Sequence, residues 1–198
     1  MKKELIELAS ALVRIPSVVG NTKTNLEALN FAKRYINVSP AVYRRDNATS
    51  YFWSNAKDTL KPNLLLLGHL DVVDVGLQLD LFEPKIKGSL LLGRGAGDMK
   101  GHIAVLLRVY KQTIEKERKA SVALLLTTDE EVGGFNGTKY VVESGLKPNV
   151  LFLPDGSVNF DIVSSEKAPH QFTLESVGKG GHAAHAFAID NPLDNVLN

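Results

Sequence analysis

The first residues whose types and spacing could do chemistry are His69 and Asp71. They follow an apolar run at residues 63–68, and strand alternation puts both side chains on the same side. A carboxylate beside a metal-bound imidazole can accept the second ring N–H, which fixes the tautomer and raises the basicity of the ligand. A purely structural histidine at a strand end is the competing interpretation. We therefore take His69 as a candidate metal ligand and Asp71 as the acid that orients it.

A glycine-rich segment at residues 93–101 carries the next acid, Asp98, at the start of a predicted helix. Glycines permit backbone geometries that are closed to other residues, and they allow a close approach to a metal site. Asp98 could instead be an ordinary N-cap of that helix. A nucleotide-binding loop is a further alternative, but the Rossmann glycine spacing and the Gly-Lys-Ser/Thr ending of a P-loop are both missing.

Further acids follow two more apolar runs. Glu130 and Glu131 lie in an acidic triplet after residues 122–127, and Asp155 comes after residues 150–153. Two adjacent glutamates can have different roles, one as a metal ligand and the other as a general base. A solvated loop is the alternative for the triplet, and an ordinary turn is the alternative for Asp155.

The elements that must position these residues form an α/β pattern. Apolar runs typical of strands buried on both faces alternate with amphipathic helices, which favours a three-layer sandwich around a mixed, largely parallel sheet. Open sheets of this kind place ligand sites at the carboxyl ends of their strands, where these acids and His69 lie. We expect helices at residues 5–13, 25–36, 100–116 and 136–144, and strands at 41–43, 50–53, 63–68, 122–127 and 150–153.

The pattern changes after residue 165. Residues 171–177 alternate polar and apolar side chains, which predicts a strand with one solvated face. We place a zinc-binding domain, its N-terminal portion, at residues 1–167 and the start of a smaller α+β lid domain at 168–198. The last residues resemble a helix that has barely begun, so we expect the chain to be cut short.

Composition narrows the classes of function. The chain has 198 residues and no cysteine, so disulfides, thiolate catalysis and cysteine zinc sites are excluded, and any metal must bind His, Asp or Glu. A formal net charge of +1 gives no indication of a nucleic-acid or membrane-surface partner. We expect a cytoplasmic protein, because no segment resembles a transmembrane helix or a signal peptide.

Three segments together, residues 68–73, 93–101 and 128–131, resemble the signatures of a known family. It comprises zinc-dependent aminoacylases and exopeptidases, among them acetylornithine deacetylase, succinyl-diaminopimelate desuccinylase, aminoacylase-1 and glutamate carboxypeptidase. The similarity covers essentially the whole chain in the same order, as the N-terminal part of such an enzyme. It implies a catalytic α/β domain followed by a lid domain through which the complete protein forms a homodimer.

The resemblance also implies a role for each site residue. It implies a cis peptide between Asp98 and Met99, and it leaves His185 without a secure counterpart. Two zinc ions would bind, although Co²⁺ or Mn²⁺ also suit such ligands. The implied roles are His69 and Asp155 as ligands of the first zinc, Asp71 as the acid orienting His69, Asp98 as the bridge between both zinc ions, Glu131 as a ligand of the second zinc, Glu130 as the general base, and His182 as a contact to substrate.

The activity implied is hydrolysis of an amide bond in N-acyl amino acids or short peptides by a zinc-activated water. Relatives supply the last ligand of the second zinc from a later segment, so we predict one tight and one weak metal site in this chain. A catalytically inactive, truncated metal-binding or regulatory paralogue is the alternative. Glu130 speaks against that alternative, since a structural metal site has no use for a general base.

Overall fold

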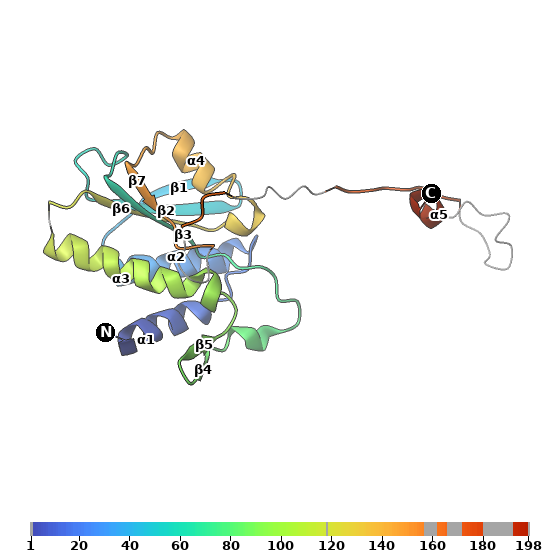
Figure 1. Cartoon of the computed structure of the whole chain (residues 1–198), viewed down its shortest axis with the longest axis horizontal. Helices are drawn as coiled ribbons and strands as arrows, with labels where there is room; N and C mark the ends of the chain where they lie inside the picture. Colours follow the sequence, from blue (N-terminus) through green and yellow to red (C-terminus); the bar gives the residue numbers. More distant parts are fainter. Residues whose placement is uncertain (1, 118, 157–161, 166–171, 180–191, 198) are drawn as a thin grey trace. The chain divides into compact units, whose positions relative to one another are not determined.

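The structure, a computed structural model, describes residues 2–117, 119–156, 162–165, 172–179 and 192–197 (Figure 1). The chain divides into two units, Met1–Asp161 and Ile162–Asn198. The predicted domain boundary after residue 167 stays a prediction. All elements that carry the candidate site belong to the first unit.

A five-stranded sheet in the order β1-β2-β6-β3-β7 forms the centre of the first unit. Strands β3, β6 and β7 run parallel to one another, whereas β2 is antiparallel to both of its neighbours. Four of the five strands therefore point the same way, as expected of a mixed, largely parallel sheet. The strands are β1 (Ala41–Arg45), β2 (Ala48–Ser54), β3 (Leu64–His69), β6 (Val122–Thr127) and β7 (Val150–Phe152).

Helices cover both faces of this sheet (Figure 1). Helices α1 (Lys2–Val13), α2 (Thr22–Ile36) and α3 (Gly101–Lys116) lie on one face, and the short α4 (Thr138–Glu143) lies on the other. Alternate residues of β3 belong to two different hydrophobic cores. Leu66 packs with the three long helices, whereas Leu65 packs in the cluster that contains Val141 of α4. Burial on both faces explains the continuous apolar run of β3, and the predicted three-layer α/β fold is confirmed.

The β3–α3 contact is unusually close because residue 68 is a glycine. A Cβ at Gly68 would lie 2.4 Å from Cδ1 of Ile103 and 3.0 Å from Cε of Met99. The start of α3, and the loop that precedes it, can therefore pack directly on the end of β3. This packing brings the Asp98 loop next to His69.

Several features differ from the sequence-based expectations. A hairpin of β4 (Lys85–Lys87) and β5 (Leu90–Leu92) follows a 3₁₀ turn at Leu79–Phe82, and neither was predicted. Residues 172–178 form no strand, although their side chains alternate. Alternation supplies a pattern but no hydrogen-bond partner, and a strand needs a neighbouring strand. Helix α5 (Pro192–Leu197) lies where the sequence was expected to begin a helix.

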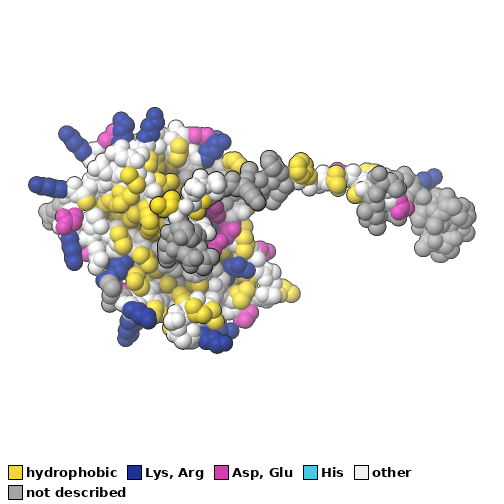
Figure 2. Space-filling view, in the orientation of Figure 1, with side chains coloured by type: hydrophobic (Ala, Val, Ile, Leu, Met, Phe, Trp, Pro, Cys, Tyr) yellow, Lys and Arg dark blue, Asp and Glu magenta, His cyan; other side chains and the backbone are white. Residues whose placement is uncertain are grey.

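The two edges of the sheet differ in character. The β7 edge exposes about half of each of Val150, Leu151 and Phe152, and Figure 2 shows hydrophobic side chains over much of the visible face of the first unit. The β1 edge instead carries Arg44 and Arg45, which are charges typical of a protected edge strand. None of the helices in the described ranges is long and apolar enough to cross a membrane.

Candidate metal centre

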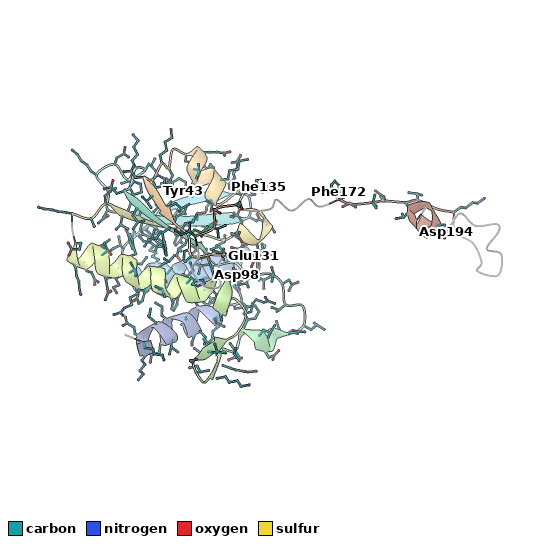
Figure 3. The ribbon with its side chains drawn as sticks, viewed as in Figure 1. Tyr43, Asp98, Glu131, Phe135, Phe172 and Asp194 are labelled. Atoms are coloured by element: carbon teal, nitrogen blue, oxygen red, sulfur yellow. The ribbon has the colours of Figure 1, made fainter. Side chains whose placement is uncertain are left out.

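The carboxyl ends of the three parallel strands bring the predicted ligands together. His69 is the last residue of β3, Glu130 and Glu131 follow β6, and Asp155 follows β7. Asp98 reaches the same edge from the loop before α3, and Figure 3 shows it beside Glu131. Residues far apart along the chain thus meet because parallel strands end at one edge of the sheet.

The Nε2 atom of His69 lies at the centre of this cluster. It is 3.0 Å from Oδ1 of Asp98, 3.5 Å from Oδ2 of Asp155 and 3.7 Å from Oε2 of Glu130. Two overlapping sets of donors result, each with its atoms within 4.8 Å of one another. One set is His69, Glu130 and Asp155, and the other is His69, Asp98 and Glu131.

The other ring nitrogen of His69 is held by Asp71. Nδ1 lies 2.9 Å from the backbone oxygen of Asp71 and 3.4 Å from its carboxylate Oδ1, and both side chains are buried. The second carboxylate oxygen, Oδ2, accepts a hydrogen bond of 3.1 Å from the backbone N–H of Glu131. Asp71 therefore contacts the imidazole mainly through its main chain, and its side chain links that imidazole to the loop after β6.

The Asp98 loop has an irregular backbone. The peptide between Asp98 and Met99 is cis, as expected, and Asp98 has extended dihedral angles (φ −127°, ψ 104°) inside the Ala96–Lys100 turn. Helix α3 begins at Gly101 with Lys100 in the N-cap position, so Asp98 is not its N-cap, which was the alternative interpretation of this residue. Its side chain remains about two-thirds exposed and points toward His69.

Charges in the cluster perturb one another strongly. Burial lowers the pKa of His69, but hydrogen bonds to Asp155 and Asp71, with the charges of Asp71 and Glu130, raise it to about 11. Asp155 affects this pKa more than Asp98 does, because Asp155 is the less exposed carboxylate and is less screened by water. The His69 hydrogen bond in turn lowers the pKa of Asp155.

Both glutamates show the opposite effect. Burial, together with the charges of Asp155, Asp71 and Asp98, raises the pKa of Glu130 above its ordinary value, although His69 opposes this shift. Burial and neighbouring acids, with Asp98 the strongest, raise the pKa of Glu131 in the same way. Carboxylates gathered at this density repel one another, so the cluster favours a positive charge at its centre.

The donor set fits a divalent metal ion. Tetrahedral zinc ligands at about 2.0–2.1 Å from the ion lie roughly 3.3 Å from one another. The distances from His69 Nε2 to Asp98 and Asp155, 3.0 and 3.5 Å, lie on either side of that value. A hard or borderline cation suits one imidazole and several carboxylates, and it would offset the repulsion among the acids.

A cavity of about 340 Å³ adjoins the cluster. It is lined largely by apolar groups, and His69 and Glu130 form part of its wall. Lys139 of α4 also lines it, with its ammonium 5.4 Å from the ring centre of Phe135, an exposed aromatic residue of the loop before that helix (Figure 3). Figure 2 shows acidic side chains on the adjoining surface.

Two predicted residues lie outside the described ranges, and two buried residues were not singled out from the sequence. His182 and His185 fall within residues 180–191, which the structure does not describe. Asp129 and Lys100 are nearly or fully buried next to the ligands. Strand alternation could have identified Asp129, because it continues the side of β6 on which Thr127 lies; nothing in the sequence marks Lys100 as buried.

Comparison with known proteins agrees with the sequence resemblance. The model of peptidase family M20/M25/M40 matches residues 65–191. Succinyl-diaminopimelate desuccinylase of Beijerinckia indica is 31% identical over 222 residues, which cover 100% of this chain and 56% of that protein. The chain thus spans about half the length of the curated relatives it matches.

Solved structures share the fold at lower identity. The M20 family metallo-carboxypeptidase Sso-CP2 from Sulfolobus solfataricus matches with a TM-score of 0.60 and 21% identity, over 78% of this chain and 37% of that one. Human carnosine dipeptidase 1 matches with a TM-score of 0.60 and 17% identity, over 78% and 39%. These likenesses bear on the fold alone.

Proposed function

This chain belongs to peptidase family M20/M25/M40, and on that premise we propose that it is the metal-binding part of a zinc-dependent hydrolase of amide bonds. The observation that carries the proposal is the convergence of His69, Asp98, Glu130, Glu131 and Asp155 at one edge of the sheet. A general base beside a cation site is what metal-assisted hydrolysis requires.

We assign the ligands as the family resemblance implies, and each assigned side chain belongs to a donor set that includes His69. His69, Asp98 and Asp155 would hold a first zinc, and Asp98 and Glu131 would serve a second. When bound, zinc in such a site supplies Lewis acidity, which makes water a stronger acid and an amide carbonyl a better electrophile. Asp71 keeps the imidazole oriented through the 2.9 Å contact to Nδ1, so that Nε2 faces the cluster.

Glu130 acts as the general base. Its side chain is half exposed and its Oε2 lies 3.7 Å from Nε2 of His69, so it stands at the margin of the cluster and is free to meet a substrate. Its carboxylate takes a proton as the water oxygen bonds to the carbonyl carbon. It then delivers that proton to the nitrogen as the C–N bond breaks, which leaves a carboxylic acid and an amine.

The substrates proposed are N-acyl amino acids and short peptides. The name of the curated relative, a desuccinylase, points to the first kind, and the name of the matching peptidase family points to the second. The cavity beside His69 and Glu130 has room for an acyl group or a small side chain, and Lys139 at its border offers a positive charge. His182 remains the proposed contact to the substrate carbonyl.

The direct test is hydrolysis by the protein that contains this chain. N-succinyl and N-acetyl amino acids and dipeptides are assayed with Zn²⁺ or Co²⁺, and release of the free amine is measured. We expect turnover of at least one class, and Glu130→Gln should lower kcat by about 10²–10⁴-fold with metal still bound. Metal binding without turnover of any class, in wild type as in the variant, would support the inactive paralogue instead.

A further inference from the structure

The three consecutive acids after β6 face in two directions. Glu130 and Glu131 belong to the metal cluster, whereas Asp129 is only 5% exposed and turns into the protein. Its Oδ2 accepts two backbone hydrogen bonds, of 2.9 Å from the N–H of Asn136 and 2.8 Å from that of Gly137. Its carboxylate thus ties the start of the loop to the end of the same loop.

The other carboxylate oxygen of Asp129 is anchored to the sheet. Oδ1 accepts a 2.8 Å hydrogen bond from the hydroxyl of Thr127, and that hydroxyl accepts one of 3.2 Å from Ser50 on β2. Asp129 also uses its main chain, because its backbone oxygen accepts from the N–H of Gly134 at 2.8 Å. Both ends of the loop are therefore fixed to the end of β6 through one residue.

The packing around this carboxylate leaves no spare room. A Cβ at Gly137 would lie 1.9 Å from Oδ1 of Asp129 and 1.9 Å from the hydroxyl oxygen of Thr127. Any side chain at position 137 must displace the carboxylate, so the fit depends on a glycine at that position. In the conformation that this fit stabilises, the two glutamates between Asp129 and Gly137 lie in the donor sets that include His69.

We propose that Asp129 is a positioning residue of the metal centre: its hydrogen bonds, and not its charge, hold the loop that presents Glu130 and Glu131. The proposal deepens the proposed function and rests on it for the identity of the site. Residues that orient metal ligands typically contribute about 10–100-fold to metal affinity. An asparagine can replace the aspartate. Its side-chain oxygen can accept from the amides of Asn136 and Gly137, and its NH₂ can donate to the hydroxyl oxygen of Thr127. The Thr127 hydroxyl can then turn and donate to Ser50.

The test compares three variants of the 198-residue chain with wild type. Zinc affinity is measured by calorimetry below each variant's melting temperature, and amide hydrogen exchange is followed at Asn136 and Gly137. Asp129→Ala and Gly137→Ala should lose about 10–100-fold in affinity at the site that Glu131 serves and should lose protection of the amides, whereas Asp129→Asn should stay within about threefold of wild type. Asp58→Ala, which removes an exposed carboxylate that accepts the N–H of Leu60, is the matched control and should change nothing at the metal site.

A loss in Asp129→Asn as large as that in Asp129→Ala would overturn the proposal, because the charge would then be the essential property. So would a folded Asp129→Ala that keeps wild-type affinity, since a purely structural role lowers the melting temperature alone. If neither alanine variant folds, Asp129→Asn decides: retained affinity and protected amides support the proposal, and loss of either overturns it.

Failure of the proposed function would be visible separately. If the variants rank as expected but no amide substrate is cleaved by the wild-type protein, only the hydrolase assignment falls. If substrate is cleaved and all variants bind zinc alike, only the role of Asp129 falls. In an active protein, loss of the loop's position should lower kcat more than it changes KM, because Glu130 acts in the chemical step.

Discussion

At the scale of single residues, the site is organised around one buried imidazole. His69 has one nitrogen fixed by Asp71 and the other surrounded by carboxylates, and this arrangement raises its pKa to about 11. A proton and a metal ion therefore compete for the same position. Sequence analysis selected His69, Glu130, Glu131 and Asp155 because they follow apolar strand runs, and Asp98 because it lies in a glycine-rich segment that opens a helix. It did not find that Asp129 faces inward, although alternation from Thr127 would have placed both side chains on the same side.

One residue of α3, Tyr110, should make the stability of the protein depend on pH at high pH. Burial raises the pKa of Tyr110 from 10.0 to about 12. Because the folded-state pKa is the higher one, this stabilisation is fully present below pH 10 and is lost as the pH rises toward 12. Urea unfolding of wild type and Tyr110→Phe at pH 9 and at pH 12 should show an extra loss of about 2–3 kcal/mol in wild type only. Equal losses in both proteins would show that the tyrosine does not titrate in this way.

At the scale of elements, the packing of β3 on α3 should tolerate no side chain at Gly68. Gly68→Ala would place a methyl group 2.4 Å from Ile103, and we expect it to lower the free energy of unfolding by about 1–3 kcal/mol. Gly97→Ala is the control, because a Cβ there meets no atom within 4 Å. Thermal or urea denaturation of both variants measures the difference. A Gly68→Ala protein as stable as the Gly97→Ala protein would show that the contact can relax freely.

Sequence analysis predicted best the elements whose type and length follow from their pattern of apolar residues. The strand at Val122–Thr127 was predicted to the residue, since an apolar run of that length between a helix and an acidic loop fits a buried strand. The hairpin at residues 85–92 was missed because its first strand, Lys85–Lys87, has one apolar residue between two lysines and therefore shows no apolar run. The strand expected at 171–177 was wrong for residues 172–177, because alternation does not reveal whether a partner strand is present.

At the scale of the whole molecule, the proposed ligand roles give two metal positions unequal sets of ligands. If His69 serves the first position with Asp98 and Asp155, Glu131 shares only Asp98 at the second. We therefore expect calorimetry of this chain to give one tight zinc site and one that is at least about tenfold weaker, since three protein ligands are the usual number for catalytic zinc. Two equally tight sites would contradict this assignment of ligands.

The fold as a whole could be predicted from the sequence, whereas the exact geometry of the site could not. Alternating buried strands and helices require a layered α/β sheet, and such a sheet collects its strand ends at one edge. Which atoms meet there depends on register, such as the pairing of His69 with Thr127 across β3 and β6. It also depends on the direction in which each carboxylate turns.

The central claim is that this edge of the sheet holds a metal ion. Anomalous diffraction at the zinc absorption edge, from crystals of the zinc-loaded chain, tests it most directly. We expect a peak at about 2.0–2.2 Å from Nε2 of His69 and from carboxylate oxygens of Asp98 and Asp155, and we expect it to vanish in His69→Ala. A zinc-loaded crystal with peaks elsewhere and none within ligand distance of His69 would contradict the account.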